Sequence, residues 1–250
     1  GHDDEDASGW VTTNAPDSGQ SVKRVEREWR ATHTGNLDSI TFTIDTTDFP
    51  AKSAGFTRYA LIIDASGGLV ADYNSSDTQT YEMEYLSGPN YAIKALVPTD
   101  AFVTIGIVRP EVSFSVSESF GFESGVTAPD SIKVMLNYIP ITAVNIDYSY
   151  APNSASIPTD YTVASATGSV TFNAKTDTAH LTFNIVGDAT PEGTEDFSVS
   201  LLIGAGNTPG ISIGSPNIHT FSIYDDDNPP KIGFGGCAET AARLCSEALC

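Results

Sequence analysis

The chain contains the stretch Gly187-Asp188-Ala189-Thr190-Pro191-Glu192-Gly193-Thr194-Glu195-Asp196-Phe197, in which four carboxylates fall within nine positions. Apolar and polar residues alternate before it, over 181–186, and after it, over 197–201. This period of two predicts a β-strand on each side of an acidic loop. Carboxylates so close together repel one another unless a cation neutralises them or they point apart into water.

A second acidic run, Asp225-Asp226-Asp227, closes the alternating segment 220–224. Loops at the ends of neighbouring strands can meet at one pole of a β-sandwich, and hard oxygen ligands from several loops are what Ca2+ requires. The sequence therefore predicts a calcium site at such a pole. The alternative is that both acidic runs are solvated loops.

The composition excludes several classes of function. The chain has 12 Lys and Arg against 32 Asp and Glu, a net charge of −20, whereas nucleic acids and anionic membranes require a basic face. Hydrophobic residues make up 40% of the chain, enough for a packed core. No stretch approaches the ~20 apolar residues of a membrane span. We therefore expect a folded protein whose acidity serves solubility or cation binding.

Short alternating segments with turn residues between them recur along the chain, without a helical period. This pattern predicts an all-β protein with two tandem β-sandwich domains. Arg109-Pro110 is the expected boundary between them. The expected parts are an extended lead-in (1–20), a β-sandwich module (21–110), a second sandwich (111–228), and a linker or start of a next module with a cysteine-containing tail (229–250).

Three features of the first 110 residues have alternative interpretations. The basic segment Lys23–Arg30 is either a ligand site or a set of ion pairs, and we favour the ion pairs. The segment Asp64–Asp72 loosely resembles a calcium loop, but a hairpin with a strand over 69–73 fits it better. Several aromatic residues would suit stacking on a glycan, although such residues more often belong to a core; they are Trp10, Trp29, Tyr59, Tyr73, Tyr81, Tyr85 and Tyr91.

The sequence lacks the motifs of common enzyme classes. It has no Gly-x-Ser-x-Gly, no phosphate-binding glycine loop and no His pair at zinc spacing. We expect His180 and His219 to point outward from strands. For glycan hydrolysis, which needs two carboxylates at a cleft, the only pair to nominate is Asp64 with Glu82 or Glu84. We therefore predict that the protein is not an enzyme.

All three cysteines, Cys237, Cys245 and Cys250, lie in the last 14 residues. The folded body therefore does not rely on disulfides. Their spacing fits no common zinc pattern, and their odd number leaves one thiol free or crosslinked between chains. We favour a tail without a structural role. The segment 230–234 echoes 110–114 at a spacing of 120 residues, which is typical of a tandem array.

Residues 111–228 resemble the Calx-β domain, which occurs in sodium/calcium exchangers, in an integrin subunit and in bacterial surface proteins. The matching segments, in the order of the family, are 114–118, 157–162, 168–172, 181–188, 191–201 and 225–227. The resemblance implies a seven-stranded immunoglobulin-like sandwich with calcium at one pole. The ligands that it implies are Glu118, Asp160, Asp188, Glu192, Glu195, Asp225, Asp226 and Asp227.

One departure from the family concerns the size of the site. Exchanger domains with the fullest sites have two adjacent acids where this chain has Asp188-Ala189. The resemblance therefore implies one to three ions rather than the fullest cluster.

Residues 1–110 more loosely resemble a β-rich module of large bacterial secreted proteins, through Arg24–Arg30 and Tyr59–Asp64. Together the two resemblances imply a non-catalytic, Ca2+-binding structural module pair of a large extracellular bacterial adhesin. Calcium would rigidify the junctions with neighbouring domains of the same chain. The alternative is that the first domain binds a surface glycan or protein. Neither interpretation involves nucleic acid or direct insertion into a membrane.

Overall fold

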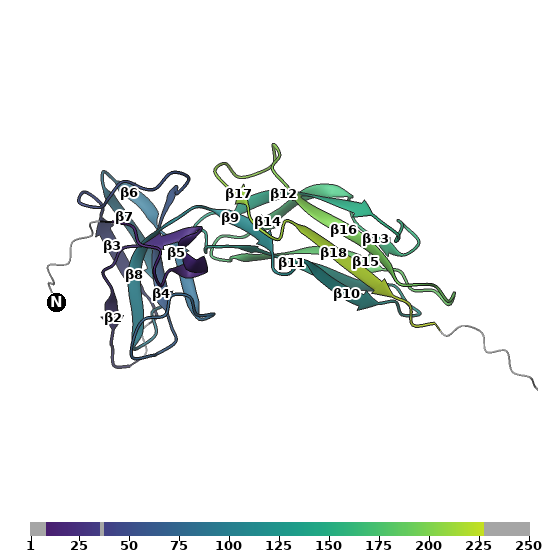
Figure 1. The fold of residues 1–250 in the computed structure, drawn as a ribbon, viewed down its shortest axis with the longest axis horizontal. Helices are drawn as coiled ribbons and strands as arrows, with labels where there is room; N and C mark the ends of the chain where they lie inside the picture. Colours follow the sequence, from purple (N-terminus) through teal and green to yellow (C-terminus); the bar gives the residue numbers. More distant parts are fainter. Residues whose placement is uncertain (1–8, 36–37, 228–250) are drawn as a thin grey trace, which may run out of the picture.

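The computed structural model describes residues 9–35 and 38–227 (Figure 1). In this part of the chain, the only helical element is one short 3-10 turn, η1 (Pro16–Gly19), and the remaining elements are strands. The strands form four sheets in two groups, and Arg109-Pro110 alone separates the last strand of the first group from the first strand of the second. This arrangement confirms the predicted pair of tandem β-domains. No helix in the described residues is both long and apolar enough to cross a membrane.

The first domain is a sandwich of a larger and a smaller sheet. The larger sheet contains β1 (Val22–Arg24), β2 (Trp29–Ala31), β4 (Arg58–Asp64), β5 (Thr78–Glu82) and β8 (Ala101–Val108). The smaller sheet contains β3 (Ile40–Asp45), β6 (Glu84–Ser87) and β7 (Asn90–Ala95). β4 and β8 are buried along almost their whole length. Both of their faces are therefore covered, which explains why they are continuously apolar rather than alternating.

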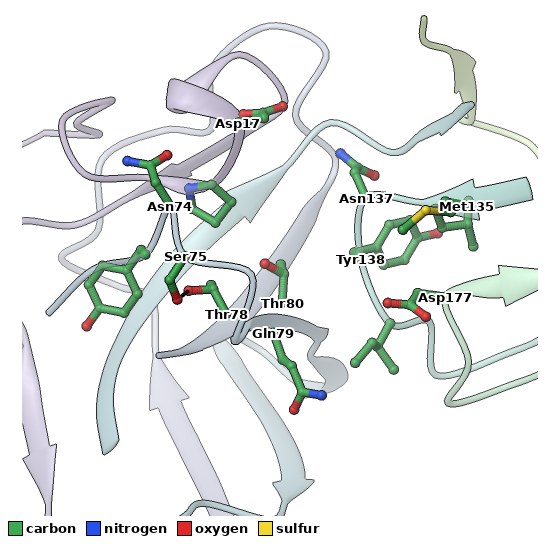
Figure 2. Close-up of a pocket in the computed structure, with 14 residues that line it drawn as sticks. Asp17, Asn74, Ser75, Thr78, Gln79, Thr80, Met135, Asn137, Tyr138 and Asp177 are labelled. Atoms are coloured by element: carbon green, nitrogen blue, oxygen red, sulfur yellow. Dashed lines mark hydrogen bonds between the residues drawn. The ribbon is translucent and has the colours of Figure 1, made fainter. Parts of the chain in front are cut away.

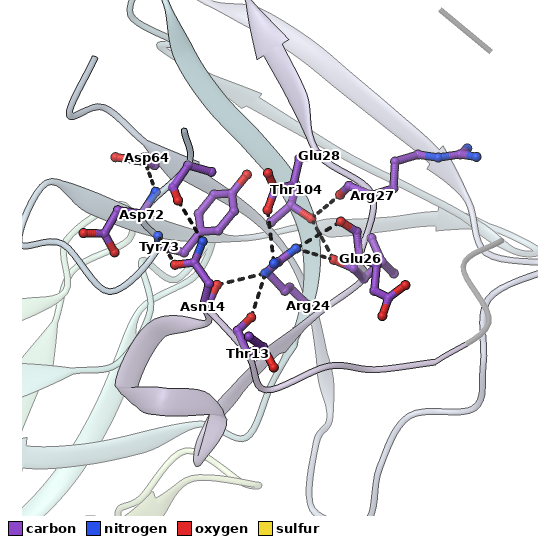
Figure 3. Close-up of polar contacts among 12 residues, drawn as sticks. Thr13, Asn14, Arg24, Glu26, Arg27, Glu28, Asp64, Asp72, Tyr73 and Thr104 are labelled. Carbon is purple, nitrogen blue, oxygen red and sulfur yellow. Dashed lines mark hydrogen bonds and ion pairs between the residues drawn. The ribbon is translucent and has the colours of Figure 1, made fainter. Parts of the chain in front are cut away.

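The lead-in is fixed to the larger sheet by Arg24, whose side chain lies in the domain interior with 7% of the residue exposed. Its Nη2 pairs with Glu28 Oε1 at 3.1 Å, and its guanidinium lies over the ring of Tyr73 (Figure 3). The remaining guanidinium N–H groups donate to the backbone carbonyls of Thr13, Asn14, Val25 and Glu26. A buried charge with this many partners is stabilised rather than available to a ligand.

Two further predictions for the first domain concern the basic segment and the strand over 69–73. Arg30 pairs with Asp100 at 3.3 Å, so ion pairs do occur along the basic segment. The predicted strand over 69–73 is wrong, because this segment is a loop in which Leu69 is 90% exposed. The next strand along the chain that pairs with β4 is β5 instead. Buried Asp64 accepts the backbone N–H groups of Ser66 and Asp72, at 2.9 and 2.7 Å, and so closes the loop.

The aromatic residues nominated for stacking are divided between core and surface. Tyr59 and Tyr73 belong to the core. Trp10 contacts Phe49 and Tyr59, with ring centroids 6.0 and 6.3 Å away. Trp29 and Tyr85 are the exposed members, at 40% and 59%.

The second domain is a sandwich of two five-stranded sheets. In one, the order is β10 (Glu118–Phe122), β18 (Ile218–Tyr224), β16 (Glu195–Leu202), β12 (Val144–Pro152) and β14 (Thr167–Phe172). In the other, it is β13 (Tyr161–Thr162), β15 (Thr178–Ile185), β11 (Ala128–Leu136), β9 (Glu111–Phe114) and β17 (Ser212–Ile213).

Seven long strand segments underlie these ten labelled strands. β9 and β10 are successive parts of one segment that crosses from one sheet to the other, and β13 and β17 have only two residues each. The seven-stranded plan implied by the resemblance is therefore present, with the first strand divided. Between the sheets, the rings of Tyr161 and Phe197 stack with centroids 4.1 Å apart, and Phe221 lies against Phe197 at 5.4 Å.

The two strand histidines differ in orientation. His180 is exposed, as predicted. His219 is 1% exposed, so its predicted outward orientation is wrong. It has the same parity along β18 as buried Phe221 and Ile223, and it hydrogen-bonds Ser119 Oγ and Val116 O at 2.8 and 2.9 Å. Burial lowers the pKa of its imidazole, an effect that the hydrogen bond to Val116 opposes.

The first domain packs against one pole of the second through the loop that follows β11. Ile139 forms a parallel bridge with Tyr81 of β5, and Asn137 Nδ2 donates to Ser21 Oγ at 2.8 Å. Glu82, 7% exposed, accepts the backbone N–H of Ile141 at 3.1 Å and pairs with Arg58 at 3.1 Å. A cleft of about 220 Å³ lies beside this contact (Figure 2). Apolar side chains from both domains also form one continuous buried cluster, so the junction is tightly packed.

Candidate metal centre

The acidic residues gather at the pole of the second domain that lies away from the first domain (Figure 1). β10 and β18 run parallel and end together, so Glu123 and Asp225, which follow these strands, leave the sheet at the same end. The loop that joins β15 to β16 carries Asp188 and Glu192 to this end, and Asp160 directly precedes β13. Four separate segments thus contribute carboxylates to one site.

Two groups of three carboxylates have oxygens close enough to share a cation. Within each group, one carboxylate oxygen of every member lies within 4.8 Å of the others. The groups are Asp160 with Glu192 and Glu195, and Asp225 with Asp226 and Asp227. The backbone N–H of Glu192 donates to Asp225 Oδ2 at 2.8 Å and joins the two groups. The structure therefore brings together six of the eight residues predicted from the sequence.

Asp188, the seventh predicted residue, borders these groups. Its own side chain accepts the backbone N–H of Thr190 at 2.6 Å. Burial raises the pKa values of Glu192 and Asp227, and the charge of Asp188 raises them further by a smaller amount. Asp188 therefore belongs to the electrostatic surroundings of the site and holds the loop in shape.

Glu123 is a member of the site that the sequence analysis missed. It is 6% exposed, and its Oε1 accepts the backbone N–H of Asp188 at 2.9 Å. Burial raises the pKa of this carboxyl group, and the charges of Asp188, Glu192 and Asp225 raise it further. A carboxylate buried beneath other carboxylates requires compensation, because an unpaired buried charge is strongly unfavourable.

Glu118, the eighth predicted residue, is not brought to this pole. It starts β10, where it is exposed and opposite Thr220, whereas the acidic pole begins after the other end of that strand. Five residue steps separate it from Glu123, which corresponds to roughly 16 Å at about 3.3 Å per residue in a strand. Its place in the site is therefore taken by Glu123.

The electrostatics of the pole favour a neutralised state. Burial raises the pKa of Glu195 to about 7, helped by a hydrogen bond with Asp160 and by the Asp160 charge. Burial by itself would raise the pKa of Asp160. Hydrogen bonds from Ser156, Thr159 and Glu195 outweigh this effect and hold the pKa below its usual value. A proton on Glu195 is therefore held between these two carboxyl groups. A cation at the same place would remove the repulsion that the proton relieves.

The residues at this pole fit a hard divalent cation. The donors are carboxylate oxygens, which Ca2+ prefers, and they come from enough groups to supply several of its six to eight ligands. Asp227 Oδ2 is buried and has no hydrogen-bond partner among the described residues. In the same part of the chain, no ion pair joins any carboxylate of this cluster to a Lys, Arg or His. The charge that would balance the cluster must therefore come from outside these residues or from bound protons.

Two of the three carboxylates nominated for catalysis, Asp64 and Glu82, have structural contacts. Asp64 is fully buried and accepts two backbone N–H groups, and Glu82 is engaged at the domain junction. Glu84 is exposed on β6.

The three cysteines and the expected linker and tail over 229–250 lie outside the described residues.

Comparison with known proteins gives a family match in the second domain. Residues 108–227 match the family model of the Calx-beta domain. A solved structure described as the apo form of the Calx CBD1 domain is 21% identical, with 47% of this chain and 98% of that chain covered and a TM-score of 0.41. A structure described as calcium binding domain CBD12 of CALX1.1 is 22% identical, with 46% of this chain and 44% of that chain covered and a TM-score of 0.40.

No curated protein matches the chain. The family-model match spans the strands, the acidic loop and the terminal aspartates on which the resemblance was based. The second domain of this chain, over residues 108–227, is therefore similar to the Calx-beta domain family.

Proposed function

We propose that the second domain binds Ca2+ at its acidic pole and that the ion stiffens the connection to the polypeptide that follows residue 227. The observation that carries this proposal is the convergence of Asp160, Glu192 and Glu195 with Asp225, Asp226 and Asp227, above buried Glu123. These residues would supply the oxygen ligands, and the ion would supply the positive charge that the cluster lacks.

The position of the pole determines which junction the ion would affect. The first domain contacts the opposite pole through Asn137, Ile139 and Ile141. One of the acidic segments, Asp225–Asp227, forms the last described residues. Calcium would therefore order the pole from which the chain leaves the second domain. The opposite pole, where the first domain packs, is held by protein contacts.

The proposed setting is a module pair of a large extracellular bacterial adhesin. Its support is the strongly acidic composition, the absence of cysteine from the first 236 residues and the tandem all-β organisation. Neighbouring domains of the same chain are the partners that this setting requires. We propose a structural role and no catalytic one.

Thermal unfolding of the full chain tests the calcium proposal. Melting in EDTA is compared with melting in millimolar Ca2+, and Mg2+ serves as the control ion because it demands a tighter octahedral site. An ion that binds only the folded state adds ~2.7 kcal/mol at 100 times its dissociation constant. A Ca2+-specific rise in melting temperature that disappears in the Glu192→Ala, Glu195→Ala double variant supports the site. Unchanged melting curves, with no heat in isothermal titration, exclude it.

A further inference from the structure

A groove of about 570 Å³ opens between the two sheets of the first domain. Its floor is apolar and comes from the larger sheet, with Leu61, Val103 and Ile105. Its wall comes from the smaller sheet, with Ile40 and Ile44 among the lining residues. This volume lies within the ~300–1,000 Å³ of ligand-binding pockets.

The groove exists because the sandwich is not closed along one side. β3 is the outer strand of the smaller sheet and pairs only with β7 among the described strands. Its inward-facing residues Ile40, Phe42 and Ile44 are only partly buried, in alternation with exposed Thr41 and Thr43. Trp29, 40% exposed, lies at the facing rim. In Figure 1, β2 and β3 are found on the same side of the domain.

The outer edge of β3 offers backbone hydrogen bonds. Thr46 N–H donates to Pro89 O at 3.0 Å, and the register continues with Ile44 opposite Tyr91 and Phe42 opposite Ile93. Antiparallel pairing alternates along a strand, so the even-numbered residues face β7 and the backbone groups of Thr41 and Thr43 face outward. Within the described residues, no hydrogen bond to these outward groups is present.

The lining of the groove differs in charge from the rest of the chain. It contains Arg30 and His33 and no carboxylate, although acidic residues outnumber basic ones in the chain by 32 to 12. Arg30 also pairs with Asp100, but both side chains are more than 40% exposed. Guanidinium has five N–H donors, so a second carboxylate can bind beside the first. The groove therefore favours an acidic occupant over a basic one.

We propose that this groove binds an extended segment of a partner polypeptide, which adds to β3 as a further strand. Alternate apolar side chains of the segment would fill the groove beside Ile40, Phe42 and Ile44, and an acidic residue would lie near Arg30 or His33. Strand addition of this kind gains affinity from main-chain hydrogen bonds and specificity from alternate side-chain positions. An exposed apolar strand edge is also prone to aggregation, which such a partner would prevent.

A defined peptide tests the proposal on the full chain. The probe is a fluorescein-labelled synthetic peptide with the sequence of residues 111–118, Glu-Val-Ser-Phe-Ser-Val-Ser-Glu, which alternates and is acidic at both ends. Its binding is followed by fluorescence anisotropy. The same peptide with N-methyl groups at alternate backbone positions keeps the side chains and loses the strand hydrogen bonds. We expect saturable binding of the first peptide and about tenfold weaker binding of the second, the effect of one to two hydrogen bonds.

A pair of protein variants locates the binding edge. Thr43→Pro removes the outward N–H at a position where an edge strand tolerates proline, and Thr43→Val keeps it. Thr43→Pro should bind the peptide about tenfold more weakly than Thr43→Val, which reports the loss of the hydroxyl alone, because the two variants differ by one to two hydrogen bonds to the peptide. If Thr43→Pro fails to fold, the N-methylated peptide still provides the test.

Three results would overturn the proposal: no saturable binding up to millimolar peptide, equal binding of both peptides, or a dimer in solution that Thr43→Pro converts to monomer. The dimer would mean that a second copy of the chain is the occupant. The groove and the acidic pole lie in different domains, so peptide binding should be the same in EDTA and in Ca2+. Failure here leaves the calcium proposal intact, and the reverse also holds.

Discussion

Glu123 and Asp188 are 65 positions apart in the chain, and the side chain of the first accepts the backbone N–H of the second at 2.9 Å. This contact joins the end of β10 to the acidic loop between β15 and β16. It places a buried carboxylate beneath the exposed ones.

Glu123→Gln should abolish most of the stabilisation by Ca2+. The amide keeps the shape and the hydrogen-bond acceptor for Asp188 but lacks the charge that draws the ion. The measurement is the shift in melting temperature between EDTA and millimolar Ca2+. Glu118→Gln is the matched control, at the start of the strand that Glu123 follows, and its shift should equal that of the unmodified chain. The assignment of the site fails if Glu118→Gln loses the shift and Glu123→Gln keeps it.

In EDTA, the chain should become less stable as the pH rises from about 4.5 to about 7. The folded-state pKa of Glu195 is about 7, above the ordinary value of 4.5. In this range the folded state holds a proton that the unfolded chain has lost, so stability is full below the ordinary pKa and is lost as the pH rises through the folded one. Melting temperatures from pH 5 to pH 8 check this at low salt.

Glu195→Gln is the informative variant for this pH dependence. It cannot ionise, so the decline in melting temperature in EDTA should become shallower, whereas Glu118→Gln should retain the full decline. In Ca2+ the dependence should reverse, because protons compete with the ion for the same oxygens and the ion stabilises more at higher pH. Identical slopes for Glu195→Gln and the unmodified chain would rule out this assignment of the proton.

Glu82→Gln should loosen the junction between the two domains. Glu82 pairs with Arg58 and accepts the backbone N–H of Ile141 from the other domain. Removing one partner from a buried pair costs several kcal/mol, and the partial exposure of Arg58 lowers this to roughly 2 kcal/mol. Limited proteolysis near Arg109 and calorimetry should reveal faster cleavage and a separate transition for each domain. Glu84→Gln, exposed on the neighbouring strand, should change neither measurement.

Phe197→Ala should destabilise the second domain by about 3–5 kcal/mol, the usual cost of removing a phenylalanine ring from a core. Phe197 is fully buried and contacts the rings of Tyr161, Phe183 and Phe221. Urea unfolding measures the change in free energy. Phe122→Ala is the control, because Phe122 is 63% exposed and should cost little. Equal losses in both variants would contradict the assigned core.

Much of the fold follows from the pattern of apolar residues, which is continuous in β4 and β8 and alternating in β15 and β16. The apolar residues of β4, β8, β15 and β16 predict buried strands, and the structure contains them. Alternation also accounts for the error at His219, because its position two residues before Phe221 already indicates the core face. The loop over 69–73 could not be recognised in this way, because Leu69 and Val70 are exposed while Tyr73 is buried, and a period of two says nothing about tertiary contacts.

The candidate site was predictable only in part for a related reason. Acidic loops that follow strands can be read from the sequence, and those of Glu192 and Asp225 do meet. Whether Glu118 or Glu123 joins them depends on where the first strand of the domain changes sheets, and on the register of β10 against β18. Neither is encoded in a local pattern. The groove of the first domain likewise depends on tertiary structure, because it forms where the two sheets of the sandwich do not meet.

The parallel pairing of β10 with β18 has a mechanical consequence. These strands belong to the first and last segments of the second domain, and five residue pairs join them in register. A force that pulls the two ends of the domain apart acts along the strands, so it loads the whole ladder in shear instead of opening one hydrogen bond at a time. An ion held just beyond the shared end of both strands would clamp that ladder. The unfolding force of a single molecule under tension should therefore be high and should rise in Ca2+.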